Sequence, residues 1–365
     1  MGVEPWDHHL QYRSTFYVYL SKTVSSMLPL AITMGCPAGI GPEIILKYFS
    51  LPEDHERPAA VVIGDFSALS YYADRFKYDV SIIPWTPGEP IQIERGVIPL
   101  FETSHLAAED IHPGHPSKKT AVAMADAIIA AVRGIQGSIF SALCTCPISK
   151  IALQESGHYY PGHTEMLAAL TASPTQVMMM AGRSLRITLA TIHCALAQVP
   201  ELLQEESLCA LFSTTHQSLK IDFDIAAPRI AVAALNPHAG EGGMFGREEE
   251  QIIIPAMKKA KNKGINLHGP FPPDTIFFKA AQGHYDAVVC MYHDQGLIPF
   301  KLLHFSDGVN VTLGLPIVRT SVDHGTAYDI AGKSIADPAS LVAAVELATT
   351  IAGNRARHKS APAVN

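Results

Sequence analysis

The sequence predicts an α/β fold, and three observations support this. Short apolar runs of strand length alternate with helix-length segments along most of the chain. Glycine- and proline-rich turns follow several of these runs. Hydrophobic residues make up 48% of the 365 residues, which is enough for a large core. Such alternation is typical of a mostly parallel sheet covered by helices on both faces. The length predicts two domains or one large α/β unit.

Composition argues against several classes of partner. The formal net charge is -7 and no long basic run is present, which argues against binding to nucleic acid. No segment has the length of a membrane span. The six cysteines form no CxxC pair, and buried free thiols in a reducing cytoplasm explain them most simply. We therefore expect a cytoplasmic protein that recognises small ligands through local Arg, Lys and His side chains.

The first elements follow from the apolar pattern in order. Residues 1–27 show no clear period and none of the features of a signal peptide. We expect a disordered extension there, or alternatively an ordered arm on a partner subunit. A buried strand is predicted over 28–34, then a glycine-rich turn over 35–43 and a helix from Ile44. Such a turn suits close backbone approach or an anion, and a plain tight turn fits equally well.

The middle of the chain continues the alternation. We predict a strand over 59–64, a β-rich region over 80–100, an amphipathic helix over 117–132 and a strand over 138–143. Gly162-His163-Thr164-Glu165 precedes a helix predicted from Met166, so His163 and Thr164 can offer donors at a positive helix end. The acidic run 248–250 is expected to face water.

Three histidines share one topological position. Predicted strands over 185–192, 230–235 and 286–291 lead directly to His193, to His238 and to His293. Ligands gather at the carboxyl ends of strands in an open parallel sheet. Any one histidine alone would suggest a structural role, but all three at that edge favour a site for zinc or another divalent ion.

The segment 292–333 concentrates polar residues in an otherwise apolar run. It opens with Tyr292-His293-Asp294-Gln295-Gly296 and contains Lys301, Asn310 and Arg319. Polar groups buried without partners are costly, so packing alone does not explain such a run. Two cations among apolar residues suit an anion such as phosphate, although both could also reach solvent from packed elements. We interpret this segment as the centre of an active site.

Four motifs together resemble the PdxA family of 4-hydroxythreonine-4-phosphate dehydrogenases, over about residues 28–352. They are Gly162–Glu165, Asn236–Gly242, Tyr292–Gly296 and Arg319–Ala327. The resemblance implies a fold like isocitrate and isopropylmalate dehydrogenases, with two α/β/α domains and a cleft between them. The implied domains are 28–130 plus 296–357, on the NAD side, and 131–295, on the metal and dimer side. One departure is Cys36, which stands where the family usually has an acidic residue.

The resemblance also implies roles for individual residues. The implied metal ligands are His193, His238 and His293. The implied substrate contacts are His163, Thr164, Lys301, Asn310 and Arg319, with Asp274 and Asp294 as further contacts. Lys301 and Asp294 are candidates for catalysis, Lys301 in proton transfer. A loop similar to the adenosine-side NAD loop of the wider group is formed by His324, Gly325, Thr326, Ala327 and Asp329.

The function implied is metal-dependent oxidation and decarboxylation of 4-phosphooxy-L-threonine to 3-amino-2-oxopropyl phosphate, in pyridoxal 5'-phosphate biosynthesis. It implies NAD or NADP, one divalent metal (Zn, Mg or Co) per site, and a homodimer with a shared active site. A sister group acting on 4-phospho-D-threonate or 4-phospho-D-erythronate has the same motifs. Two other classes stay open: a His-ligated metallohydrolase and a non-catalytic protein that binds a phosphorylated metabolite.

Overall fold

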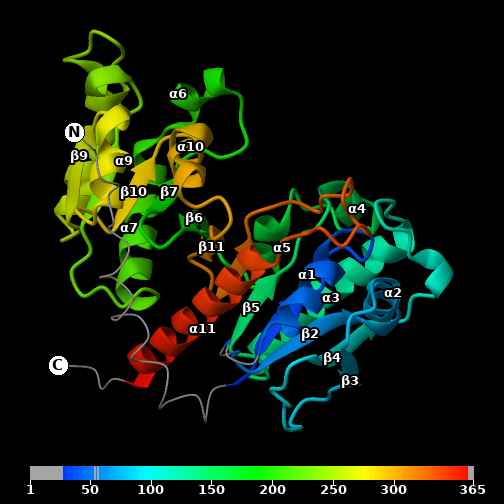
Figure 1. Cartoon of the computed structure of the whole chain (residues 1–365). Coiled ribbons are helices and arrows are strands. Elements are labelled where there is room, and N and C mark those ends of the chain that lie inside the picture. The colour runs from blue at the N-terminus through cyan, green and yellow to red at the C-terminus, as the bar shows by residue number, and fades with distance from the viewer. Residues whose placement is uncertain (1–27, 53–54, 56, 361–365) are drawn as a thin grey trace, which may run out of the picture.

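The described residues form one twelve-stranded sheet with helices packed against it (Figure 1). The computed structural model describes residues 28–52, 55 and 57–360, so the extension predicted over 1–27 lies outside it. In spatial order the strands are β3 (Ser81–Pro84), β4 (Val97–Ser104), β2 (Ala60–Asp65), β1 (Leu30–Thr33), β5 (Ala142–Thr145), β12 (Arg319–Val322), β11 (Val309–Leu313), β6 (Val177–Ala181), β7 (Arg186–Leu189), β10 (Ala287–Cys290), β8 (Ile230–Ala233) and β9 (Leu267–Phe271).

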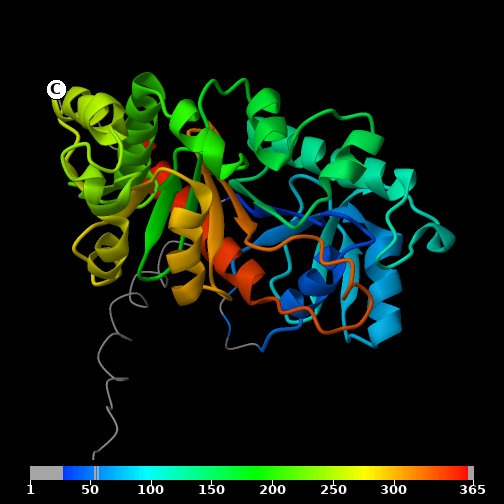
Figure 2. The same cartoon turned by 90° about the horizontal axis from the view of Figure 1, so that it is seen from above.

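The helices divide between two halves of the molecule (Figures 1 and 2). Packed with β1–β5 and β12 are α1 (Gly41–Phe49), α2 (Phe66–Phe76), α3 (Lys118–Gln136), α4 (Lys150–Glu155), α5 (His163–Leu170) and the long α11 (Ala339–Ser360). In the half built on β6–β10 are α6 (Val199–Leu202), α7 (Glu205–Ile221), α8 (Ile254–Lys261), α9 (Pro273–Ala281) and α10 (His293–Leu303). The shorter helical elements are 3-10 turns at Ala108–Asp110, Leu196–Gln198 and Pro237–Gly240 and a π-helical turn at Glu249–Ile253.

The predicted parallel sheet is confirmed in both halves. β1 pairs in parallel with β2 and β5, and β10 pairs in parallel with β7 and β8. The exceptions lie in the middle, where β11 is antiparallel to both β12 and β6, and β6 is antiparallel to β7. β11 therefore joins the two halves through backbone hydrogen bonds.

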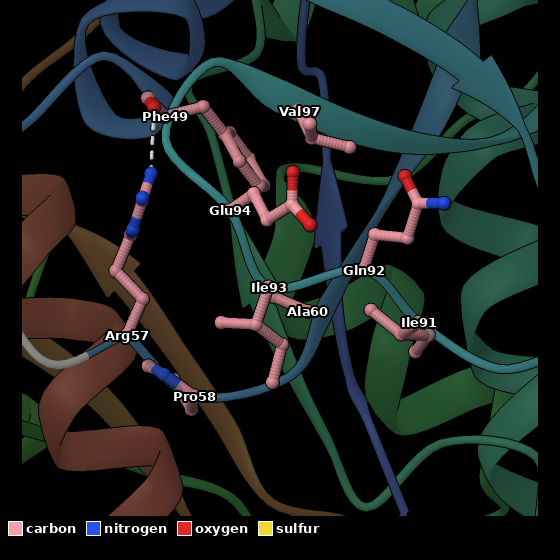
Figure 3. Close-up of a pocket in the computed structure, with 9 residues that line it drawn as sticks. All are labelled: Phe49, Arg57, Pro58, Ala60, Ile91, Gln92, Ile93, Glu94 and Val97. Atoms are coloured by element: carbon pink, nitrogen blue, oxygen red, sulfur yellow. Dashed lines mark hydrogen bonds between the residues drawn. The ribbon is translucent and has the colours of Figure 1, made fainter. Parts of the chain in front are cut away.

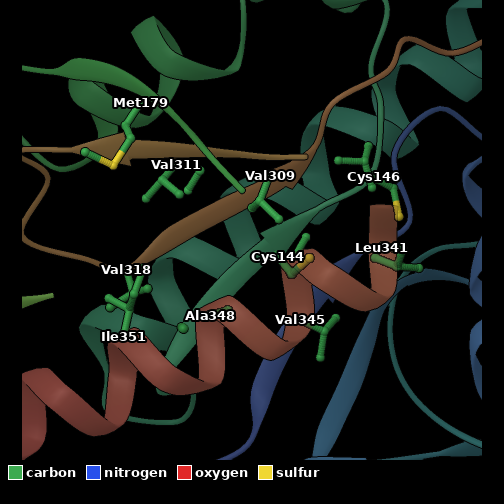
Figure 4. Close-up of a cluster of buried hydrophobic side chains, with 14 of the residues drawn as sticks. Cys144, Cys146, Met179, Val309, Val311, Val318, Leu341, Val345, Ala348 and Ile351 are labelled. Atoms are coloured by element: carbon green, nitrogen blue, oxygen red, sulfur yellow. The ribbon is translucent and has the colours of Figure 1, made fainter. Parts of the chain in front are cut away.

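Side chains alternate across the sheet and fill a core on each face. Leu30 and Ile32 of β1 belong to one buried cluster, whereas Ala31 belongs to another that includes residues of α3. In the first cluster α11 presents Leu341, Val345, Ala348 and Ile351 along one side, as helical spacing requires (Figure 4). Cys144 and Cys146 are part of it, and all six cysteines of the chain are free, as expected.

Two segments pack against the half of the molecule to which the predicted domain boundaries did not assign them. Residues 142–170 were assigned to the second domain, but β5 pairs with β1 and both α4 and α5 pack on α3. Residues 296–303 were assigned to the first domain, but α10 packs on β7 and β10. The division into two domains stays a prediction, because a single sheet runs through both halves.

One cavity at the amino-terminal edge of the sheet is too small for a substrate. It is lined by Phe49, Ala60, Ile93 and Val97 among others (Figure 3), and its volume of about 10 Å³ is room for about one water molecule. Beside this cavity, Arg57 donates a hydrogen bond to the carbonyl of Phe49 (2.6 Å). Phe49 is the last residue of α1, and a positive charge stabilises the negative C-terminal end of a helix. Within the described residues no helix is long and apolar enough to cross a bilayer.

Candidate active site

The glycine-rich turn after β1 packs against a second loop. Gly35 has a φ of +73°, and a Cβ on Gly41 would lie 2.0 Å from the Met34 carbonyl oxygen, so both positions require glycine. The N–H of Ile40 donates to the carbonyl of Thr326 (3.1 Å). The sequence suggested that another part of the backbone comes close to this turn. In the structure that part is the loop 323–333.

Cys36 makes the second link between these loops. Its thiol is completely buried and accepts a hydrogen bond from the Tyr328 hydroxyl (3.3 Å). Burial raises the pKa of the Cys36 thiol, which keeps it neutral. A neutral thiol thus occupies the position where the resemblance leads one to expect a carboxylate.

Arg319, the first residue of β12, is a buried cation that forms no ion pair within the described residues, although the charge of Glu165 acts on it. Its Nη1 donates to Thr312 Oγ1 (3.0 Å) and its Nη2 to Thr145 Oγ1 (2.9 Å), while its Nε is enclosed and has no partner. Among the described residues no carboxylate forms a hydrogen bond or ion pair with it. Burial lowers the pKa of Arg319 to about 10. An isolated guanidinium in such surroundings is suited to bind an anion.

His163, at the start of α5, lies close enough to Arg319 to sense its charge. The pKa of His163 is well below the ordinary value, first because of burial and second because of the Arg319 charge. Its Nε2 is enclosed without a partner, and so is Oδ1 of Asn310 on β11. The structure therefore brings two of the predicted substrate residues together. Thr164 is half-buried beside His163, and Asp274 is exposed on the first turn of α9.

Lys301 links the two halves through a residue that the sequence did not identify. Its Nζ lies 3.2 Å from Oδ2 of Asp323 and donates to the Asp323 carbonyl (3.4 Å). Lys301 belongs to α10, whereas Asp323 follows β12 and immediately precedes His324. Burial raises the pKa of Asp323, and the Lys301 charge counteracts that rise.

The three candidate metal ligands follow three neighbouring parallel strands, as predicted. The order β7-β10-β8 puts His193, His293 and His238 at one edge. The rings of His193 and His293 lie 6.0 Å apart. Burial, Lys150 and His293 lower the pKa of His193, which favours a neutral imidazole. His293 Nδ1 donates to Asp294 Oδ1 (2.7 Å), which leaves Nε2 for a ligand.

His238 points elsewhere. It lies in the 3-10 turn after β8 with a φ of +53°, is exposed, and has its ring 6.1 Å from that of Phe245. Across the described part of the chain, no three His, Cys, Asp or Glu side chains are grouped closely enough to hold a metal ion. The donor chemistry thus fits a divalent metal, but a single chain brings only His193 and His293 together.

Glu249 corrects one expectation from the sequence. The acidic run 248–250 was expected to face water, but Glu249 is buried, and its Oε1 accepts from the N–H groups of Leu235 and Asn236 (2.8 Å each). Oε2 accepts from the Asn236 side chain (3.0 Å). The carboxylate thereby fixes the turn that carries His238. The sequence carried one signal for this contact: a turn that follows a buried strand has backbone N–H groups that need an acceptor.

The fold and this edge define a class: an α/β protein that carries a buried arginine, His163 and the pair His193 and His293 among its polar residues. A family profile described as "Pyridoxal phosphate biosynthetic protein PdxA" matches residues 56–348. The chain belongs to the PdxA family. It is a dehydrogenase and hence an oxidoreductase, and the family links it to pyridoxal phosphate biosynthesis.

Individual relatives agree with this assignment. A 4-hydroxythreonine-4-phosphate dehydrogenase of Desulforapulum autotrophicum is 49% identical over 321 residues, 87% of this chain and 94% of the relative. The crystal structure of that enzyme from Klebsiella pneumoniae is 37% identical with a TM-score of 0.83, covering 89% of this chain and 98% of the other. A protein provisionally named D-threonate 4-phosphate dehydrogenase, from Oceanobacillus iheyensis, is 42% identical over 325 residues, 88% of this chain and 97% of the relative. The predicted fold class is thereby confirmed.

Proposed function

We propose that this enzyme oxidises and decarboxylates 4-phosphooxy-L-threonine to 3-amino-2-oxopropyl phosphate, with NAD or NADP as the oxidant. The observation that carries the proposal is the buried, unpaired Arg319 beside His163. A guanidinium with a free donor and a neutral imidazole together match the oxygens of a phosphate monoester. The names of the relatives at 49% and 37% identity support this substrate.

Other predicted residues would complete the substrate contacts. The N-terminus of α5 directs its free N–H groups to the region of His163 and Thr164. Asn310 and Lys301 approach from β11 and α10. Asp274 and Asp294 are proposed as additional contacts, with Asp294 also orienting the His293 ring. The cofactor loop would comprise His324, Gly325, Thr326, Ala327 and Asp329, and the enclosed, unpartnered Nε2 of His324 supports a ligand there.

We infer a homodimer in which two chains complete each metal site. His193 and His293 of one chain, together with the partner subunit's His238, would hold one zinc, magnesium or cobalt ion. Exposed apolar side chains next to these residues support an interface: Met244 and Phe245 near His238, and Ile298, Leu302, Leu303 and Phe305 along and after α10. The six free cysteines support a cytoplasmic location.

Mixed dimers test the shared site directly. A dimer that combines a His193→Ala chain with a His238→Ala chain keeps one intact site if the ligands come from both chains. We therefore expect the mixture of two inactive variants to regain activity, up to half of the wild-type value per dimer. If all three ligands come from one chain, each site in the mixed dimer lacks a ligand, and no activity returns.

The side chains of this protein would act on a substrate fixed at both ends. When bound, the metal would lower the pKa of the substrate hydroxyl, and the nicotinamide would accept the hydride. Arg319 and His163 hold the phosphate, which fixes the carbon that bears the hydroxyl. Lys301, on α10, would provide a proton donor for the carbon that loses CO2.

The decisive assay uses metal-free enzyme with NAD or NADP, added divalent ions and a panel of phosphorylated hydroxy acids. We expect NADH or NADPH and CO2 to appear together with 4-phosphooxy-L-threonine. The relative from Oceanobacillus iheyensis supports 4-phospho-D-threonate, or the related 4-phospho-D-erythronate, as the alternative substrate. A higher kcat/KM for either would replace the main proposal. No reduced cofactor with any member of the panel would refute it. Membership of a dehydrogenase family argues against the metallohydrolase and the non-catalytic protein.

A further inference from the structure

We infer that Asp323 is a positioning residue that holds Lys301 in place, so that N–H groups of the ammonium stay free for the substrate. The inference deepens the proposed function and rests on it. It starts from the pair that joins α10 to the end of β12, with Nζ of Lys301 3.2 Å from Oδ2 of Asp323.

One of the three N–H donors of Lys301 is used in a hydrogen bond to the Asp323 carbonyl (3.4 Å). The Asp323 carboxylate adds an ion pair, with its Oδ2 3.2 Å from Nζ, but that oxygen accepts no hydrogen bond. Two N–H groups of the ammonium are therefore left over. The Lys301 side chain is 40% exposed, whereas that of Asp323 is 12% exposed. The anchor is therefore enclosed, while the lysine still has an open side.

Asp323 is itself fixed to the sheet and to α11. Its N–H donates to Ser340 Oγ (3.0 Å), and that hydroxyl donates to the carbonyl of Gly308 (3.2 Å). A free lysine side chain loses rotamer entropy when it is immobilised. An anchor that is rigid before the substrate arrives removes part of that cost from the reaction. Because the two residues lie in different halves, the pair also sets the position of α10 relative to β12.

The pair is electrostatic as well as geometric. Burial raises the pKa of the Asp323 carboxyl, and the charge of Lys301 is the first of the causes that oppose this rise. In the proposed reaction the C–C bond to the carboxylate breaks, CO2 leaves, and the electron pair remains as an enolate. An N–H bond of Lys301 then breaks and its proton bonds to the carbon that lost CO2. A proton from solvent restores the ammonium, which balances the proton that the substrate hydroxyl released during the oxidation.

Substitutions at both members of the pair test this role. Asp323→Asn preserves an acceptor but removes the charge, and Asp323→Ala removes both. We expect Asp323→Asn to lower kcat at least tenfold with KM within threefold. Asp323→Ala should lower kcat further. In a Lys301→Ala background, Asp323→Asn should change kcat by no more than twofold, because it acts through the lysine. Asp224→Asn, in an exposed pair with Arg357, is the matched control and should behave as wild type.

Two results would overturn the inference. One is a kcat of Asp323→Asn equal to that of wild type, and the other is a full additional loss in the Lys301→Ala background. If the variants do not fold, amine acylation of the wild-type protein decides. Lys301 reacting as readily as the exposed Lys359 would exclude an anchored amine, and slower reaction would support it. This labelling needs no turnover, so it remains informative if the wild-type enzyme oxidises no phosphorylated hydroxy acid and the proposed function fails.

Discussion

Replacing Arg319 by methionine separates a role in ligand binding from a role in folding. The folded-state pKa of Arg319 lies below its ordinary value of 12.5, at about 10. The unfolded chain therefore holds the proton more tightly, and the charge disfavours folding by about 3 kcal/mol at any pH below about 10. Two hydrogen bonds to threonines return about 1 kcal/mol each. Removing the charge should leave the free energy of unfolding unchanged or raise it by about 1 kcal/mol.

The same substitution should be severe for catalysis. A hydrogen bond between charged groups contributes about 1.5–3 kcal/mol, and a guanidinium can make two to one phosphate. Their loss corresponds to a decrease in kcat/KM of about 10²–10⁴-fold. Urea unfolding of the ligand-free protein and steady-state kinetics measure the two effects separately.

Arg355→Met is the control. Arg355 is also largely buried, but it pairs with Asp222 through Nε (2.6 Å) and Nη2 (3.1 Å). Its removal leaves a buried carboxylate without a partner, which costs about 3–5 kcal/mol. We expect Arg355→Met to destabilise the protein and to retain kcat/KM. If Arg319→Met destabilises the protein as strongly, Arg319 is a structural residue and the reasoning is refuted.

Three further predictions concern other parts of the site. The folded-state pKa of His163 lies below its unfolded value, so stability is lost as pH falls below about 6.5, by at most about 1.4 kcal/mol per pH unit. His163→Asn should thus lose less stability than wild type between pH 6.5 and 5.5 in urea unfolding, and equal losses would contradict this. Glu249→Ala should lower the free energy of unfolding by about 2–4 kcal/mol, because two backbone donors lose their acceptor; an unchanged urea midpoint would argue against it. Prolonged chelation should abolish NADH formation, and added divalent ion should restore it, whereas full activity in protein shown by elemental analysis to be metal-free would exclude a metal.

The sequence located buried strands well because a strand covered on both faces is apolar throughout. Predicted runs over 28–34 and 230–235 became β1 and β8. The run over 138–143 became β5 only at 142–145, since Ser138 has a φ of +57° and the apolar residues after it pack outside the strand. Apolar runs report burial more directly than backbone conformation.

Elements set by packing were harder to predict. The segment His293–Leu303 forms α10 although Pro299 lies inside it, and proline is the strongest local signal against a helix. Packing on β7 and β10 overrides that signal. The antiparallel β11 was also not expected, because alternation of strands and helices predicts parallel pairing.

The candidate site shows the same limit. Arg319 and His163 carried recognisable sequence context, but their partners did not. Thr145 is 174 residues from Arg319 along the chain, and an isolated threonine carries no signal of its own. Asp323 stood inside a motif, yet its pairing with Lys301 depends on how α10 meets β12. Such partners become visible only when distant segments are brought together.

An unbroken sheet restricts how the two halves can move. Because β11 hydrogen-bonds to β12 on one side and β6 on the other, neither half can swing about a flexible linker. Relative rotation has to be absorbed elastically, as extra twist spread over many backbone hydrogen bonds. Displacement is then smallest at the strand where the twist is centred and largest at the outer loops. Asn310 lies within β11, so its position should change less than that of the outer loops when the two halves twist against each other.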